Sequence, residues 1–113
     1  MVNATVTERG CQVGSLWQWD RGQVLEIRGM SLPTTPEVHF AHGKLEEAQP
    51  VKATMNAAGI IRAAIPDELL ETAQPVKAWV CIETGGAFRS LYRLTIPVLG
   101  RPRPGTNEEE FNG

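Results

Sequence analysis

Residues 76–83 form the clearest period-two pattern in this sequence. Val76, Ala78, Val80 and Ile82 share one parity, and Lys77, Trp79, Cys81 and Glu83 occupy the other. Side chains on a β-strand point alternately to opposite faces of the sheet, so this run predicts a strand whose first set of side chains lies in the core. Such a run, closed by the turn residues Thr84-Gly85-Gly86, favours a fold built from short strands.

Further runs rich in strand-forming residues repeat the pattern along the chain. In residues 23–29, Leu25 and Ile27 alternate with polar side chains, and we expect these two to face the core. Prolines at 33 and 36 and a polar loop at 41–47 separate the runs. Besides 76–83, strands are expected at residues 13–19, 23–29, 37–40, 51–55, 59–65 and 91–99.

Two turns predict which of these strands are neighbours. Asp20-Arg21-Gly22 lies between the strands expected at 13–19 and 23–29, and a short glycine-containing loop between two such runs is typical of a hairpin. Asn56-Ala57-Ala58-Gly59 lies between the strands at 51–55 and 59–65, and it predicts a second hairpin for the same reason.

One helical turn is expected, at residues 66–72. Pro66 suits a first helical position, and Asp67 and Glu68 complement the positive end of the helix dipole. About seven to eight short strands with one such turn favour an all-β, antiparallel β-sandwich over an α/β fold. We expect one sandwich domain at residues 1–104, followed by a flexible acidic C-terminal tail at 105–113.

Composition excludes several functional classes. The chain has 113 residues, a formal net charge of −2 and 42% hydrophobic residues, as expected for a single soluble domain. At this charge the chain lacks the excess of basic residues that is typical of nucleic-acid-binding proteins, and it lacks a polybasic patch that would bind an anionic membrane surface. No apolar run approaches the roughly 20 residues that span a bilayer, and residues 1–10 lack the pattern of a secretion signal. The chain is therefore expected to fold in a cytoplasm.

Few residues offer chemistry. His39 and His42 lie three positions apart without further ligands at a known metal spacing, and we interpret them as structural or surface residues. Cys11 and Cys81 form no Cys-x-x-Cys motif and are expected to be reduced and packed, although a bridge between them stays open. The sequence contains no nucleophile elbow, phosphate-binding loop or zinc-protease motif. We expect no catalytic residues, no cofactor and no metal, and hence no enzyme.

Two tryptophans could instead make contacts. Trp17 and Trp19 share a parity, so on one strand they would lie on the same face. They could fill the core, they could form a protein contact, where tryptophan is enriched, or they could stack on a sugar. The pattern alone leaves all three interpretations open.

Several segments resemble a known family. Residues 18–29 read QWDRGQVLEIRG, residues 36–40 read PEVHF, and residues 65–70 read IPDELL. Together with Ile96-Pro97-Val98 and the exit Arg101-Pro102-Arg103-Pro104, they resemble short phage and prophage structural proteins of Gram-positive bacteria. That family is similar to the immunoglobulin-like N-terminal domain of phage baseplate upper proteins and to domains of phage fibre proteins. The likeness covers roughly residues 12–104.

The resemblance implies a non-enzymatic adaptor in a phage particle, at the tail baseplate or a fibre attachment site, made in the bacterial cytoplasm. It implies an immunoglobulin-like sandwich, contacts with other virion proteins, and a homo-oligomer in the particle, without nucleic-acid binding or membrane insertion. A carbohydrate-binding module for a host-surface glycan and a head-decorating fibre protein are the alternatives. The residues expected to make particle contacts are Trp17, Trp19, Asp20, Arg21, Arg101 and Arg103.

Overall fold

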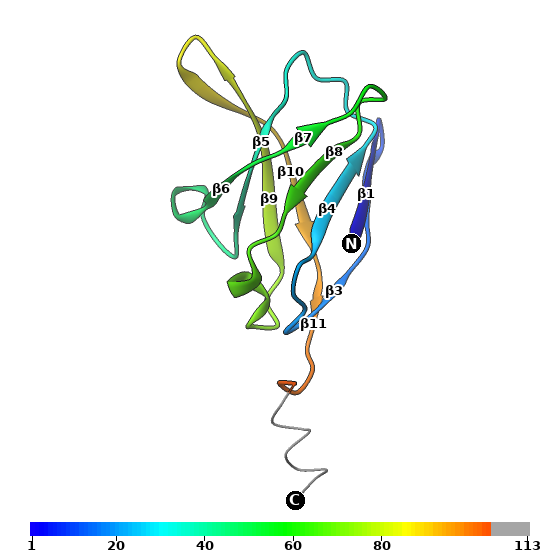
Figure 1. Cartoon of the computed structure of the whole chain (residues 1–113), viewed down its shortest axis with the longest axis vertical. Coiled ribbons are helices and arrows are strands. Elements are labelled where there is room, and N and C mark those ends of the chain that lie inside the picture. The colour runs from blue at the N-terminus through cyan, green and yellow to red at the C-terminus, as the bar shows by residue number, and fades with distance from the viewer. Residues whose placement is uncertain (105–113) are drawn as a thin grey trace, which may run out of the picture.

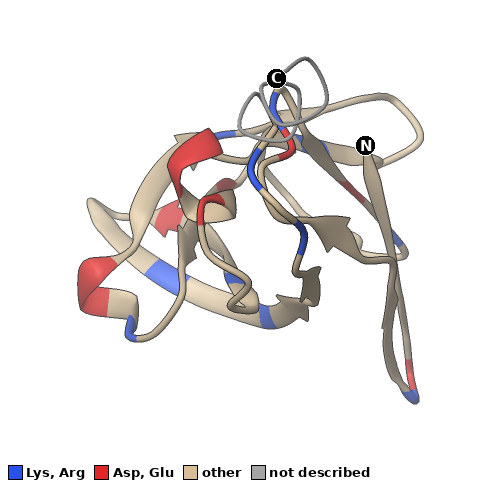
Figure 2. Ribbon diagram, turned by 90° about the horizontal axis from the view of Figure 1, so that it is seen from below, with Lys and Arg blue, Asp and Glu red and all other residues tan. Residues whose placement is uncertain are grey.

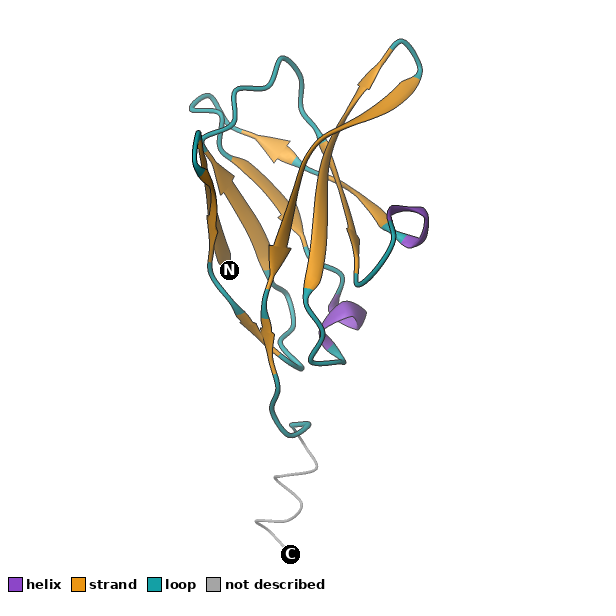
Figure 3. Ribbon diagram, turned by 180° about the vertical axis from the view of Figure 1, so that it is seen from behind, coloured by secondary structure: helices purple, strands orange, loops and turns teal. Residues whose placement is uncertain are grey.

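Two β-sheets pack face to face, and a two-stranded ribbon lies at the end of the molecule where the described chain leaves it (Figures 1 and 3). The structure is a computed structural model that describes residues 1–104, so the tail expected at 105–113 lies outside the described residues. The all-β sandwich predicted from the sequence is confirmed. No helix among the described residues is long and apolar enough to cross a membrane.

The first sheet has five strands in the order β2-β1-β4-β8-β7. Strands β1 and β2 form an antiparallel hairpin, β4 runs parallel to β1, and β8 runs antiparallel to both β4 and β7. The strands of this sheet are β1 (Val2–Thr7), β2 (Gly10–Val13), β4 (Val24–Arg28), β7 (Thr54–Met55) and β8 (Ile61–Ala64).

The second sheet has four antiparallel strands in the order β10-β9-β5-β6. Its strands are β5 (Glu37–Ala41), β6 (Gln49–Lys52), β9 (Val76–Thr84) and β10 (Ala87–Ile96). The separate ribbon pairs β3 (Leu16–Trp17) in parallel with β11 (Val98–Leu99). Two short 3₁₀-helices complete the described elements, η1 (Leu45–Glu47) and η2 (Asp67–Leu70).

The eleven strands within residues 1–104 exceed the expected seven or eight for two reasons. The polar-looking N-terminus forms β1, in which Val2 and Ala4 are buried between exposed neighbours, and this strand was not expected. Several expected runs are also divided: the run at 13–19 ends one strand and contains another, and the run at 91–99 is interrupted between β10 and β11. The helical turn expected at 66–72 is present as η2, whereas η1 was not expected.

One of the two expected hairpins is wrong. The segments at 13–19 and 23–29 do not pair with each other, because β3 pairs with β11 and β4 pairs with β1 and β8. The hairpin at 51–65 is confirmed in its second half, where β7 pairs with β8 across the turn at 56–59. Its first half, β6, belongs to the opposite sheet, so the chain changes sheets at Ala53.

The core lies between the two sheets and is built from alternate residues of nearly every long strand. Leu25 and Ile27 of β4 are fully buried, as predicted, and they belong to the same cluster as Val38 and Phe40 of β5. Leu70 of η2 closes the cluster at one end. Each such side chain contributes roughly 1.5–3 kcal/mol when removed from water, so this layer supplies most of the stability.

Glu26 is buried although it faces away from the core, and its side chain is only 4% exposed. Arg28 Nη2 donates to its Oε1 at 2.7 Å, and Arg62 Nε of the neighbouring strand donates to its Oε2 at 2.9 Å. Side-chain hydrogen bonds from Arg28 and Arg62 lower the pKa of Glu26 below its ordinary value of 4.5. The carboxylate therefore stays charged and joins β4 to β8 on the outer face of the sheet.

We expect Leu25→Ala to lower the free energy of unfolding by about 2–5 kcal/mol, because it removes methyl groups from a fully buried site and leaves a cavity. Leu45→Ala is the matched control, since Leu45 is 39% exposed and its loss is expected to stay within about 0.5 kcal/mol. Urea denaturation followed by tryptophan fluorescence measures both. Equal losses in the two variants would contradict the assignment of Leu25 to the core.

The ion pairs of Glu26 predict a pH-dependent contribution to stability. Because its pKa is lowered in the folded state, this contribution is present above the unfolded pKa and is lost as the pH falls through the folded value. We expect Glu26→Gln to be less stable than wild type at pH 7, and the difference to shrink progressively below pH 4.5. Urea denaturation at several pH values measures this difference in the free energy of unfolding. A difference that stays constant down to pH 3 would contradict the prediction, and Glu8→Gln in an exposed turn is the charge-matched control.

Candidate functional site

The candidate site is built around the turn at residues 18–23, which connects β3 to β4 at the lower end of the molecule in Figure 1. Because β3 pairs with β11, this turn lies against the strand by which the chain leaves the sandwich. The Leu16 amide donates to the Pro97 carbonyl at 2.9 Å, and the Gln18 amide donates to the Leu99 carbonyl at 2.7 Å. The start and the end of the domain therefore meet here.

The helix η2 holds the other side of the turn. Trp19 has a φ of +73°, in the left-handed region that is uncommon for a residue with a side chain. Its amide donates to the Leu70 carbonyl at 2.6 Å, which compensates for this conformation. Gly22, with a φ of +65°, donates its amide to the Asp67 carboxylate at 2.9 Å. Two anchors on η2 thus determine the shape of the turn.

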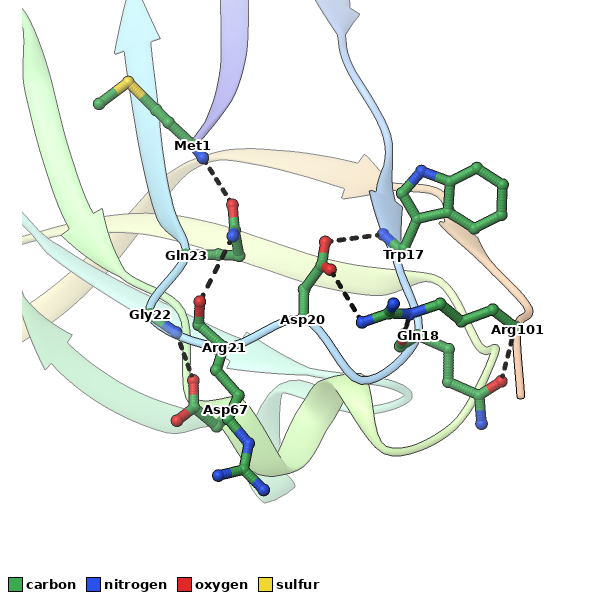
Figure 4. A network of polar contacts seen from close by, with 9 residues as sticks. All are labelled: Met1, Trp17, Gln18, Asp20, Arg21, Gly22, Gln23, Asp67 and Arg101. Carbon is green, nitrogen blue, oxygen red and sulfur yellow. Dashed lines mark hydrogen bonds and ion pairs between the residues drawn. The ribbon is translucent and has the colours of Figure 1, made fainter. Parts of the chain in front are cut away.

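Asp20 and Arg101 connect the turn to the exit strand (Figure 4). Asp20 Oδ2 accepts the Trp17 amide at 3.1 Å, and its Oδ1 lies 3.5 Å from Arg101 Nη2. Arg101 Nε also donates to the Gln18 carbonyl, and its amide donates to Gln18 Oε1 at 3.3 Å. Gln18 Nε2 in turn donates to the Glu71 carbonyl at 2.9 Å. These bonds bring together residues that are far apart in the sequence.

A hollow of about 360 Å³ lies beside this network. Trp19 and Pro104 provide its apolar lining, and charged side chains provide most of the remainder. Figure 2 views the molecule from this end, where basic and acidic positions both surround the point at which the described chain stops. The residues lining the hollow are Trp19, Asp20, Arg21, Gln23, Arg101, Arg103 and Pro104.

The Arg103 guanidinium lies over the Trp19 ring, and both residues line the hollow. The guanidinium carbon lies 5.1 Å from the centre of the tryptophan ring, within the range of a cation–π interaction. A smaller hollow of about 100 Å³ adjoins the first and shares four of its residues, and Asp67 and Glu71 complete its lining. The shared residues are Trp19, Asp20, Arg21 and Arg103. Basic and acidic side chains therefore both line the smaller hollow.

Trp17 lies outside the hollow, on the outer face of the β3–β11 ribbon. It is paired in register with Leu99, and the two side chains are 49% and 42% exposed. Their neighbours Leu16 and Val98 point the opposite way and are buried in the core. The Trp17 amide donates to Asp20, which lines the hollow and pairs with Arg101, so Trp17 borders the charged site (Figure 4).

The structure brings five of the six predicted contact residues to one hollow and places the sixth, Trp17, beside it. The expectation that Trp17 and Trp19 share a strand face is wrong, because β3 ends at Trp17 and the backbone turns through the positive φ of Trp19. Neither ring belongs to the core cluster of buried residues. Sequence reasoning missed Gln18 and Asp67, whose roles depend on segments distant in the chain and left no local signal.

The histidines and cysteines lie elsewhere. His39 hydrogen-bonds the Glu37 carboxylate at 3.1 Å, and the His42 ring donates to the Leu69 carbonyl at 2.7 Å, so both have structural partners. Cys11 and Cys81 are both free, and Cys81 is buried although it faces away from the core. Within residues 1–104, no three histidine, cysteine or acidic side chains are grouped as metal ligands would be.

The sequence matches no family model and no curated protein. Among solved structures, it is similar to the N-terminal domain of phage TP901-1 ORF48, with a TM-score of 0.54 and 13% sequence identity. The likeness covers 89% of this chain and 96% of that chain. At this identity the comparison establishes a shared fold.

We expect Asp20→Ala to loosen the turn and to lower the free energy of unfolding by about 0.5–1.5 kcal/mol, because the Trp17 amide loses its acceptor. Hydrogen exchange at the Trp17 amide is expected to accelerate. Asp20→Asn, which keeps an oxygen acceptor, is the matched control and should retain most of the protection. Unchanged exchange in the alanine variant would show that Asp20 does not hold the turn.

Proposed function

We propose that this chain is a non-enzymatic structural protein of a bacteriophage particle, an adaptor at the tail baseplate or at a fibre attachment site. The observation that carries the proposal is the fold, whose likeness to the N-terminal domain of a phage protein extends over nearly all of both chains. The segments at 18–29 and 36–40, which resemble phage structural proteins, point the same way. Fold alone does not determine function, so the proposal also depends on the site.

The strand order supports an immunoglobulin-like type of sandwich. In that fold one sheet has the order A-B-E-D, and the other has G-F-C with an added C′ strand. The order β1-β4-β8-β7 corresponds to the first, and β10-β9-β5-β6 corresponds to the second. Strand β1 departs from the pattern, because it runs parallel to its neighbour β4.

The lower end of the sandwich is the proposed attachment surface. It combines an exposed tryptophan with a hollow rich in arginine, and both residue types are enriched where proteins bind one another. The hydrogen bonds to η2 and β11 hold the turn in one shape, which reduces the entropy lost on binding. In a particle that contains many copies, a modest contact at this end is strengthened by avidity.

Two observations favour a protein contact over a glycan platform. A sugar platform needs open aromatic faces, but the Trp19 ring is covered by the Arg103 guanidinium. Trp17 is the exposed tryptophan of the pair, and its register partner is Leu99 rather than a second ring. An aromatic side chain beside an aliphatic one suits an apolar protein surface better than a stacked sugar.

The proposal predicts that the protein is a component of purified phage particles. Mass spectrometry of gradient-purified virions should detect it in many copies, and antibody labelling in the electron microscope should place it at the tail tip. Label on the head would instead assign it to a head-decorating fibre. Absence from complete, infectious particles would overturn the structural role, and binding to host-surface glycans would then be the function to test.

A further inference from the structure

The hollow at the lower end contains two arginines that the described part of the chain does not neutralise. Arg101 pairs with Asp20 at 3.5 Å. Arg21 and Arg103 line the same hollow and make no ion pair within residues 1–104. Two cations facing one hollow repel each other, so a ligand that carries carboxylates would be stabilised between them.

Arg103 is held in a suitable orientation for such a ligand. Its guanidinium carbon lies 5.1 Å from the centre of the Trp19 ring, and a guanidinium over an aromatic face can still donate two parallel hydrogen bonds to a carboxylate. The Trp19 backbone is fixed by the bond to Leu70. The contact with Trp19 therefore removes part of the entropy that the Arg103 side chain would otherwise lose when a ligand binds.

The surroundings distinguish a peptide from other anions. Trp17 and Leu99 extend the site beyond the hollow as an exposed apolar pair, which a small inorganic anion would leave uncovered. Asp67 and Glu71 line the adjoining hollow together with Arg21 and Arg103, so they restrict an anionic ligand to the larger hollow, where Asp20 is the one acidic residue among the described residues of the lining.

We propose that this hollow binds an acidic peptide segment of a partner protein. Its carboxylates bond to Arg21 and Arg103, and an adjacent apolar side chain packs on Trp17 and Leu99. Such a segment would belong to the protein that contacts the proposed attachment surface, so its biological role rests on the proposed function. The binding itself depends only on the geometry of the hollow, so it is testable without any phage particle.

The probe is a fluorescein-labelled peptide that contains three consecutive glutamates followed by phenylalanine, and its control has three glutamines in their place. Fluorescence anisotropy with the full chain is expected to show binding of the glutamate peptide, weakening as salt rises from 0.05 to about 0.5 M, as ion pairing requires. The glutamine peptide is expected to bind at least tenfold more weakly. Both measurements are made outside any particle, so they are separate from the localisation experiment.

The double variant Arg21→Gln, Arg103→Gln tests the two arginines, and its expected effect is a loss of at least tenfold in affinity for the glutamate peptide. The matched control is Arg9→Gln, Arg89→Gln, which removes the same charge from two exposed positions far from the hollow and is expected to keep the wild-type affinity. Circular dichroism and the melting temperature confirm that both variants are folded. Trp17→Ala is expected to weaken binding several-fold through the apolar contact.

Four results would overturn the proposal, and the first three are no binding of the glutamate peptide at 1 mM by the wild type, equal binding of both peptides, and an equal loss in the control variant. Displacement of the peptide by duplex DNA at equal charge concentration would assign the hollow to phosphate chains and would also overturn it. This chain has acidic residues of its own at 108–110. The variant Glu108→Gln, Glu109→Gln, Glu110→Gln is therefore measured in parallel, and it should bind the probe as tightly as wild type or more tightly.

Discussion

Each long strand of this chain has one face made of side chains that water solvates poorly, and the fold depends on covering those faces with a second sheet. The alternation that produces these faces is visible in β4, β5 and β9, whose inward residues belong to one cluster except for Ile82 of β9, which was expected in the core but is only partly buried. Because a slip of one residue would move every apolar side chain to the solvent, this burial also determines the register of the sheets. The outer ion pairs of Glu26 then strengthen a pairing that the core has already selected.

The shape of the lower end of the sandwich follows from the same constraint. Leu16 and Val98 are buried in the core, and this burial holds the β3–β11 ribbon against the sandwich. Their outward neighbours, Trp17 and Leu99, are then necessarily exposed. The turn that follows β3 must reverse direction to reach β4, and the positive φ of Trp19 lets it do so while η2 accepts its amide. The hollow is thus a product of how the chain enters and leaves the sandwich.

Local sequence was sufficient for those features that depend on neighbours in the chain. The pattern at 76–83 predicted β9, and the proline and acidic residues at 66–68 predicted η2. Strand β1 was missed although Val2, Ala4 and Val6 alternate with polar residues, because the alanine is small and the remaining positions are polar, so the segment looked like a polar terminus. The residues around Asp20 do form a turn, but the expected hairpin was wrong. The strands on either side of the turn pair with other segments of the chain, β3 with β11 and β4 with β1. The resemblance to a family indicated the contact residues. No pattern near Arg101 or Gln18 in the sequence, however, predicts the hydrogen bond between them.

That bond spans 83 positions of the chain. Contacts between such distant residues form late, because the intervening loop must close before they are stabilised. During synthesis the turn at 18–23 emerges from the ribosome long before Arg101 exists, so an incomplete chain cannot display the finished hollow. A ligand that requires the finished hollow would therefore bind complete, folded chains in preference to truncated or misfolded ones.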